Sequence, residues 1–354
     1  MQTDPPPSVT AQAVEALWYT RCPVPSASSL AIDHGWLDDE FERDGITVAS
    51  LRASDSQSVR ESHFDHSQAD SFRQGGNIPP IWTRSQGGDT ALVAISWTDE
   101  YQAVIARPDS GIETVADLRG RRLGLPRRVN DRIDYWQAMC LRGYLSALGL
   151  ADLGAEDVEL VDLPVDETFI GASDTSKHGT LWSGARRARR QQIETFALIR
   201  GEVDAIYTAG APGAQLAAFL DARDVVELGR HVDPMVRCNN QTPTIMTVSG
   251  RLARDHPDIV ARYLRRLIKA AAWAGDHRDE TARIVANDVG APEEWVRAAY
   301  GADLYRDLGL DLSDDGIAAV VAQKEFLLRH GFIARDFDTA EWIASEPLEL
   351  ARRV

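Results

Sequence analysis

The sequence predicts an α/β fold with mixed β-sheets flanked by helices. Short runs of apolar and β-branched residues alternate along the chain with longer segments whose apolar residues recur at helical spacing. Such alternation is typical of parallel or mixed sheets covered by helices. The chain has 354 residues and no low-complexity linker. It is therefore long enough for two lobes, and we expect strands rather than a linker to connect them.

The first strand is expected over residues 16–20, where a short apolar run follows a Pro-rich start. Pro25, with serines beside it, marks the first turn of a helix, which Gly35 and the acidic segment after it close. The other strands are expected on short segments rich in apolar and β-branched residues: GITVASLR, ALVAISWT, QAVIARP, RRLGLP, VELVDLP, GEVDAIYTAG and TPTIMTVSG.

Helical periodicity predicts helices over residues 134–149, 185–200 and about 257–275, with a short helix on VADLRG. The second of these is rich in arginine and includes RRARR at residues 186–190. We expect that run to be a solvated helix face rather than an anion site. From about residue 291 the chain is mostly helical.

The strand pattern also indicates how the chain divides. We expect crossings between the lobes near residues 100–110 and 230–245. Residues 1–105 and 236–354 then form the first lobe, and residues 106–235 form the second.

Charge and hydropathy exclude several classes of partner. Asp and Glu number 54 against 38 Lys and Arg, which gives a formal net charge of −16. This balance argues against nucleic acid or an anionic membrane surface, because phosphate would be repelled. A small anion would need a local positive pocket. The sequence contains no long apolar span and no secretory signal, so we expect a cytoplasmic protein.

Three cysteines, Cys22, Cys140 and Cys238, form no CxxC pair. This usage argues for a reducing compartment and against a disulfide framework or zinc ribbon. Cys22 lies between an expected strand end and a helix N-terminus, where unpaired N–H groups favour anions. A small buried hydrophobe is the alternative. We expect Cys140 in the core and Cys238 in a polar loop.

Two further segments carry candidate polar groups. His63 and His66 are spaced to share one helical face, but no third ligand stands out, so we expect no metal site. Arg73 precedes Gly75 and Gly76 in an expected turn. Paired glycines allow successive N–H groups to point at one anion, and a guanidinium can hold two of its oxygens. An ordinary turn with a solvated arginine is the alternative.

Several segments resemble known families. VADLRGRRLGLP, GEVDAIYTAGAPGA and SGRLARDHPDIVARYLRRLIKAAAWAGDH are similar to type II periplasmic-binding-protein folds, above all the nitrate, sulfonate and taurine binders. This resemblance covers roughly residues 15–290 and indicates fold rather than chemistry. YTRCPVPSA and SHFDHSQADSFRQGGNIPP resemble the aromatic sulfinate desulfinases of dibenzothiophene desulfurisation, which use this two-lobed fold without transport.

The second resemblance implies a catalytic set of Cys22, His63 and Arg73, all in the first lobe. Arg73 and the Gly76 amide would hold a sulfinate, and His63 would set the proton state of Cys22. Cleavage of an aromatic C–S bond with water would release sulfite and an arene or phenol. The resemblance implies no cofactor, a small anionic aromatic substrate and, we expect, a monomer.

It also implies two aromatic walls. Trp136 aligns with a pocket tryptophan of the desulfinases, and Phe64 adjoins His63; core packing is the alternative for Trp136. Two mechanisms fit the same residues: the Cys22 thiolate attacks the sulfinate sulfur, or the Cys22 thiol protonates the ring carbon that bears sulfur.

Other functions remain open on the same fold. A solute-binding protein for a sulfonate, taurine or nitrate-type anion would feed an ABC transporter and would bind without turnover. A ligand-sensing or pyrimidine-synthesis relative would lack the Cys–His–Arg set.

Overall fold

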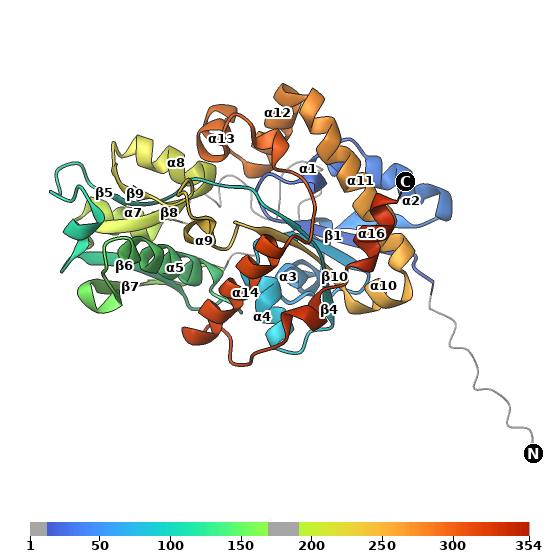
Figure 1. Cartoon of the computed structure of the whole chain (residues 1–354), viewed down its shortest axis with the longest axis horizontal. Helices are drawn as coiled ribbons and strands as arrows, with labels where there is room; N and C mark the ends of the chain where they lie inside the picture. Colours follow the sequence, from blue (N-terminus) through green and yellow to red (C-terminus); the bar gives the residue numbers. More distant parts are fainter. Residues whose placement is uncertain (1–12, 169–190, 354) are drawn as a thin grey trace, which may run out of the picture.

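The computed structural model describes residues 13–168 and 191–353, and its strands there form two five-stranded sheets (Figure 1). The first sheet has the order β2-β1-β3-β10-β4. Its strands are β1 (Ala16–Arg21), β2 (Thr47–Ser50), β3 (Ser71–Gly75), β4 (Thr90–Ser96) and β10 (Thr244–Ser249). β1 pairs in parallel with β2 and β3, and β10 runs antiparallel to β3 and β4.

The second sheet has the order β7-β6-β8-β5-β9. Its strands are β5 (Gln102–Ala106), β6 (Arg122–Arg128), β7 (Glu159–Val165), β8 (Ala205–Ala209) and β9 (Arg223–Glu227). β6 is parallel to β7 and β8, whereas β5 is antiparallel to β8 and β9. The predicted α/β fold with mixed sheets is confirmed.

Helices cover both faces of the first sheet and bury separate apolar clusters there. One face carries α1 (Ala27–Asp33), α2 (Trp36–Phe41), α10 (Gly250–Asp255), α11 (Pro257–Asp276) and α16 (Glu346–Arg352). The other carries α3 (Gln57–Asp65), α4 (Ile78–Ser85), α14 (Asp314–Arg329) and α15 (Thr339–Trp342).

The second sheet is covered in the same way. α5 (Tyr135–Gly149) packs on one face, in the apolar cluster that continues to α3 and α4. The other face holds α7 (Gln192–Ile199), α8 (Gly210–Phe219), the end of α12 (Arg278–Val289) and α13 (Glu293–Tyr300). The short α9 (Pro234–Arg237) precedes the return to β10.

The lobes follow these sheets, and we propose the division on that basis. Strands from residues 16–96 and 244–249 build the first sheet, and strands from residues 102–227 build the second. α13 nevertheless packs against α8 on the second sheet. We therefore assign α13 to the second lobe, although the sequence analysis places residues 236–354 in the first lobe.

Local signals explain where the first helices begin and end. Ser26 caps α1, and its hydroxyl accepts a hydrogen bond from the Ser29 N–H, so the helix begins two residues later than Pro25 suggests. Gly35 adopts φ +71°, a left-handed conformation that glycine tolerates. Because the chain turns there and then continues as α2, the acidic segment forms a helix of its own.

The sequence predicts a turn at Arg73–Gly76, and this prediction is wrong for its first three residues. Arg73, Gln74 and Gly75 belong to β3, which lies at the centre of the first sheet and is buried along its whole length. Arginine and glutamine are uncommon in a buried strand, so the pattern did not indicate one. The arginine-rich run at residues 186–190 lies outside the described residues, and α7 begins after it.

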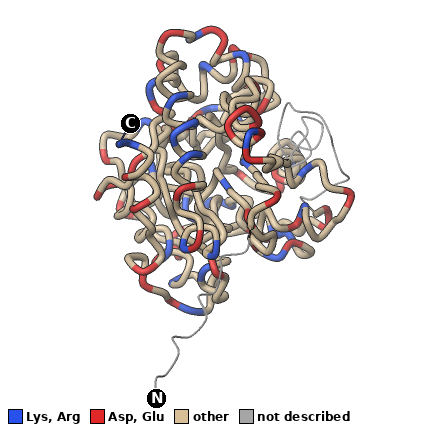
Figure 2. Tube along the Cα trace, turned by 90° about the vertical axis from the view of Figure 1, so that its right-hand side faces the viewer, with Lys and Arg blue, Asp and Glu red and all other residues tan. Residues whose placement is uncertain are grey.

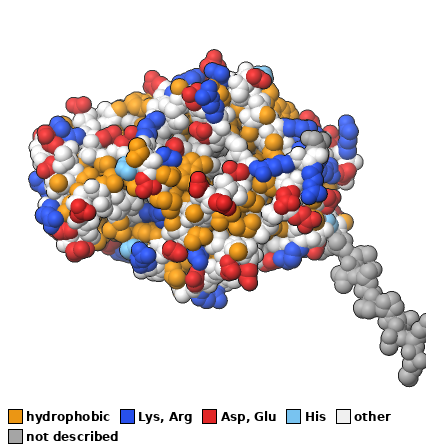
Figure 3. Space-filling model, in the orientation of Figure 1, with side chains coloured by type: hydrophobic (Ala, Val, Ile, Leu, Met, Phe, Trp, Pro, Cys, Tyr) orange, Lys and Arg blue, Asp and Glu red, His pale blue; other side chains and the backbone are white. Residues whose placement is uncertain are grey.

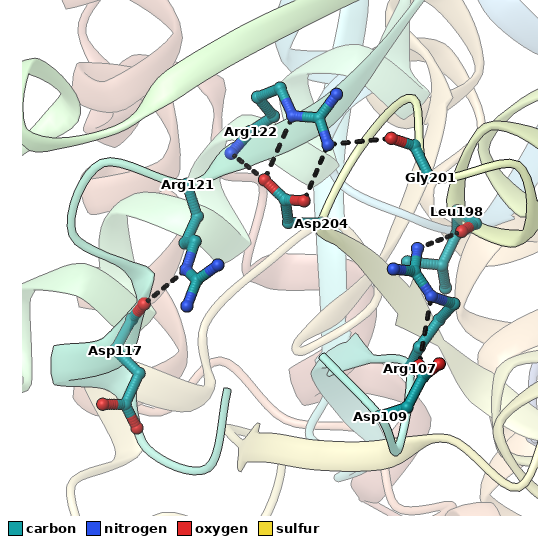
Figure 4. A network of polar contacts seen from close by, with 8 residues as sticks. All are labelled: Arg107, Asp109, Asp117, Arg121, Arg122, Leu198, Gly201 and Asp204. Atoms are coloured by element: carbon teal, nitrogen blue, oxygen red, sulfur yellow. Dashed lines mark hydrogen bonds and ion pairs between the residues drawn. The ribbon is translucent and has the colours of Figure 1, made fainter. Parts of the chain in front are cut away.

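Arginine side chains in and beside the second sheet contact the end of α7 and the segment between α7 and β8. Arg122 on β6 donates to both carboxylate oxygens of Asp204 and, at 2.8 Å, to the carbonyl of Gly201 (Figure 4). Arg107 donates to the carbonyl of Leu198 on α7.

Acidic and basic residues are interspersed along the trace in Figure 2 and over the face shown in Figure 3. No helix among residues 13–168 and 191–353 is long and apolar enough to cross a bilayer.

A buried ion pair fixes β1 against α12. Arg21, at the end of β1, donates through Nε and Nη2 to the two carboxylate oxygens of Asp288 at 2.8 and 2.6 Å. The side chains are only 5% and 3% exposed. This pair lies one residue before Cys22, so it holds the end of the strand from which the thiol projects.

We predict that Asp288→Ala lowers the free energy of unfolding by about 3–5 kcal/mol, because it leaves a buried guanidinium without its carboxylate. Urea denaturation measures the loss. Asp279→Ala is the control on the same helix, since its carboxylate is 96% exposed and pairs with Arg297 at the surface. Equal stability of the two variants would contradict the prediction.

Candidate active site

Cys22 follows the last residue of β1 and lies at the buried end of the parallel pair β1–β3. Its backbone N–H donates to the carbonyl of Gln74 at 2.9 Å, which continues the ladder beyond the strand. The side chain is 5% exposed. Gly75 on β3 lies directly beside it: a Cβ on Gly75 would stand 2.3 Å from the Cys22 Sγ. The thiol therefore fills the space that a glycine leaves open.

His63 approaches the thiol from the last turn of α3. Its Nε2 lies 3.7 Å from the Cys22 Sγ, and its Nδ1 lies 2.8 Å from the hydroxyl of Thr20. Thr20 is on β1, two residues before the cysteine. The imidazole is completely buried. Because Thr20 fixes one ring nitrogen, the other is held toward sulfur, where it can exchange a proton with the thiol.

Arg73 completes the cluster from β3, where it lies beside Thr20 of β1. Its guanidinium donates to the His63 carbonyl at 2.9 Å, to the Gly76 carbonyl at 2.8 Å and to the Cys22 Sγ at 3.7 Å. These contacts use three of the five N–H donors of an arginine, so two remain. Burial lowers the pKa of Arg73, while the nearby Cys22 opposes that shift. Arginine stays charged even so, and it places a buried positive charge beside the sulfur.

A polar loop lies against the segment that follows β3. The carboxamide oxygen of Asn240 accepts from the Ile78 N–H at 3.0 Å, and Asn77 donates to the carbonyls of Asn239 and Pro243. A Cβ on Gly76 would lie 2.5 Å from Asn240. Gly76 is therefore required for the close approach of this loop, in addition to the anion-binding role that the sequence suggests.

Two adjoining cavities open at the cluster. The smaller, of about 240 Å³, is lined by Cys22, Pro23, His63, Phe64, Arg73, Pro79, Tyr135, Asn240 and Gln241. The larger, of about 560 Å³, is lined by Pro23, Val24, Glu100, Tyr135, Trp136, Met139, Gln191, Ala209, Gly210, Pro212, Gln241 and Tyr300. Three lining residues are common to both. The thiol therefore lies in the smaller of two cavities that share part of their wall.

The two aromatic candidates lie on these walls. Phe64 lines the smaller cavity, meets the His63 ring edge-on at 5.1 Å and stacks on Tyr135 at 6.1 Å. Trp136 lines the larger cavity and is also packed in the core, at 5% exposure. Its indole N–H donates to the Glu194 carboxylate at 2.7 Å, so its orientation is fixed.

The other two cysteines lie away from the cluster of Cys22, His63 and Arg73. Cys140 is buried in the core as predicted, and burial raises its pKa. Cys238 begins the polar loop after α9, as predicted, and is buried there at 2% exposure. Its Sγ donates to the Pro234 carbonyl at 3.3 Å, and burial raises its pKa to about 11. Neither thiol lines the two cavities.

His66 does not share a helical face with His63. It ends α3 in the left-handed conformation at φ +51°, and its Nε2 contacts the Ser71 carbonyl at 3.2 Å. No cluster of three or more His, Cys, Asp or Glu side chains suited to a metal ion occurs in the described ranges.

Sequence reasoning missed several cavity residues. Tyr135 and Met139 flank Trp136 on α5 and appear in the sequence as ordinary helix positions. Asn240 and Gln241 come from a run of consecutive amide side chains before Pro243, and that unusual run is the signal that could have found them. Glu100 gives no such signal, because a carboxylate between two strands is typical of a loop.

Comparison with known proteins now decides the family. The chain is 30% identical to the 2'-hydroxybiphenyl-2-sulfinate desulfinase of Rhodococcus erythropolis, over 94% of this chain and 92% of that protein. The chain belongs to the 2'-hydroxybiphenyl-2-sulfinate desulfinase family. The resemblance read from the N-terminal motifs is thereby confirmed. No family model matches the chain.

Solved structures agree with this desulfinase assignment. The desulfurization enzyme DSZB superposes with a TM-score of 0.75 at 28% identity, covering 95% of this chain and 98% of that one. A cysteine-to-serine mutant of DSZB in complex with biphenyl-2-sulfinic acid superposes with a TM-score of 0.73 at 27% sequence identity, and the coverage of both chains is the same. The periplasmic aliphatic sulphonate binding protein of Escherichia coli superposes with a TM-score of 0.66 at 17% sequence identity, over 94% of this chain and 92% of that protein. That last likeness confirms the type II periplasmic-binding-protein fold alone.

Gly75→Ala should destabilise this desulfinase-family fold by roughly 1–3 kcal/mol, because the added methyl group meets the Cys22 side chain and overpacks the end of β1. The φ of +152° at Gly75 adds strain for any residue with a Cβ. Urea denaturation measures the change. Gly149→Ala is the control, since a Cβ there meets no atom within 4 Å. An unchanged Gly75→Ala variant would refute the tight contact.

Stability should also depend on pH through His66. Burial lowers its pKa from 6.5 to about 4, so the unfolded chain binds a proton before the folded one does. The neutral imidazole therefore contributes fully above pH 6.5, and about 3 kcal/mol is lost as the pH falls to about 4. His66→Asn retains a residue that tolerates the left-handed conformation. Its unfolding free energy should fall less steeply over this range than that of the wild type; parallel curves would contradict the assignment.

Proposed function

We propose that this chain is an aryl-sulfinate desulfinase that hydrolyses an aromatic C–S bond and releases sulfite with an arene or phenol. The observation that carries the proposal is the buried cluster of Cys22, His63 and Arg73 on the wall of the smaller cavity. Family membership supports it, as does the DSZB mutant structure, in which serine replaces a cysteine and biphenyl-2-sulfinic acid is bound.

The smaller cavity suits the sulfinate group. Arg73 brings a buried positive charge and two N–H donors beyond those that hold His63, Gly76 and Cys22. We assign the Gly76 amide to the same anion, because the residue adjoins the guanidinium contact. Phe64 and Trp136 then act as walls for the aromatic rings, with the rings extending into the larger cavity.

The overall reaction balances with water alone: an aryl sulfinate and water give the arene and hydrogen sulfite. In one route the Cys22 thiolate forms a bond to the sulfinate sulfur and the C–S bond breaks. The ring carbon keeps the electron pair of that bond and takes a proton, which gives the arene. Water then cleaves the bond between the two sulfur atoms, which releases sulfite and restores the thiol. In the other, the Cys22 thiol gives its proton to the ring carbon, sulfur dioxide leaves, and water hydrates it and restores the thiol. Both routes need the same residues.

His63 serves each route through one geometry. Its Nε2 faces the Cys22 Sγ and its Nδ1 is held by Thr20, so it receives or returns the thiol proton without moving. Arg73 holds the sulfinate and stabilises negative charge on sulfur and oxygen. We propose that the protein acts in the cytoplasm, since this chemistry requires a reduced thiol and its described cysteines are all unpaired.

A solute-binding role on the same fold has weaker support. The sulfonate-binding relatives are 17% and 23% identical to this chain. Binding alone would not require a thiol in contact with an imidazole and a guanidinium. Catalytic release of sulfite separates the two functions, because a binding protein takes up its ligand without turnover.

Cys22→Ser should reduce sulfite release from 2'-hydroxybiphenyl-2-sulfinate by on the order of 10³-fold or more, because a serine hydroxyl is a far weaker acid and nucleophile. Substrate binding, measured by calorimetry, should persist. Cys238→Ser is the matched control: this buried thiol donates to a carbonyl, as a hydroxyl also can, and lies outside both cavities. Substantial turnover by Cys22→Ser would refute both routes.

A further inference from the structure

Glu100 is a buried carboxyl on the wall of the larger cavity, and the mechanism does not use it. It lies between β4 and β5, is 3% exposed and lines the cavity together with Trp136 and Tyr300. Its Oε1 makes no hydrogen bond within the part of the chain that the structure describes. Buried polar atoms are nearly always paired, so an unpaired one on a cavity wall points to a ligand group.

The backbone around this carboxyl is shaped to leave room beside it. Gly210, at the start of α8, adopts φ +66°, and a Cβ there would lie 3.3 Å from the Glu100 Oε2 and 3.1 Å from the Tyr300 hydroxyl. The carboxyl and the phenol therefore converge on one glycine at the cavity wall. Val24, Trp136 and Met139 provide apolar surface in the same cavity, which suits a ring with one polar substituent.

We propose that Glu100 binds a hydroxyl group carried by the aryl sulfinate on the part of the molecule remote from sulfur, and so selects hydroxylated substrates. This inference rests on the proposed function, which places the sulfinate at Arg73 in the smaller cavity. The larger cavity adjoins it through Pro23, Tyr135 and Gln241, so a second ring extends toward Glu100.

The chemistry favours an uncharged partner for this carboxyl. Burial raises the pKa of Glu100 to about 8, so the group is largely protonated at neutral pH. A neutral carboxyl both donates and accepts, as a phenolic hydroxyl does, and the two satisfy one another. A substrate without the hydroxyl would leave the carboxyl unpaired in the complex, which disfavours its binding.

Kinetics with two substrates test the assignment. We expect the wild type to prefer 2'-hydroxybiphenyl-2-sulfinate to biphenyl-2-sulfinate by about tenfold in kcat/KM, the effect of one net hydrogen bond of about 1.4 kcal/mol. Glu100→Leu should abolish this preference by slowing the hydroxylated substrate alone. Glu100→Gln, which can still donate and accept, should retain most of it.

Glu227→Leu is the matched control, because its carboxyl is partly buried on β9, the strand that pairs with β5, but lines neither cavity. It should keep the wild-type preference. An equal rate for both substrates in the wild type overturns the inference whether or not the variants fold, and so does an unchanged preference in Glu100→Leu. Absence of sulfite from both substrates with the wild type would instead refute the proposed desulfinase activity.

Discussion

The buried guanidinium of Arg73 is the interaction on which the site depends. It contacts three segments at once: the end of α3 through the His63 carbonyl, the chain after β3 through the Gly76 carbonyl, and the chain after β1 through the Cys22 Sγ. A buried charge requires such partners, because without them its desolvation would be very unfavourable. The same contacts that stabilise the charge therefore hold the thiol and the imidazole at their separation.

The sheet provides the constraint that makes this arrangement possible. β1 and β3 are parallel neighbours, with Thr20 beside Arg73 and Arg21 beside Gln74. Their carboxyl ends reach the same edge of the sheet, where both strands give way to loops. Gly75 leaves room for the Cys22 side chain, and the Arg21–Asp288 pair fixes the strand just before it. Backbone pairing thus positions the reacting groups more rigidly than flexible side chains alone could.

The sequence predicted the strands whose apolar residues alternate and the helices with clear caps or periodicity, and the motif around Cys22, His63 and Arg73 indicated the cluster. β3 was missed because Arg73 and Gln74 are buried by partners from distant segments, which no local pattern reveals. The position of His66 was missed because His66 itself ends α3 in the left-handed conformation, which takes its side chain off the helical face. Glu100 and Gln241 line the larger cavity together with residues that are distant in the sequence, which no local pattern reveals.

The two sheets and their helices contribute different walls of the two cavities. Cys22 directly follows β1, and His63 and Arg73 lie on α3 and β3, so all three belong to the first sheet and its helices. Trp136, Gly210 and Tyr300 come from α5, α8 and α13, which pack on the second. Under the proposed function, substitutions on the second sheet would therefore reshape the wall assigned to the substrate rings without moving the thiol. Under the proposed function, this separation lets one fold serve sulfonate-binding proteins and desulfinases alike: the chemistry would require a few residues at one strand edge, whereas selectivity would be set on the opposite wall.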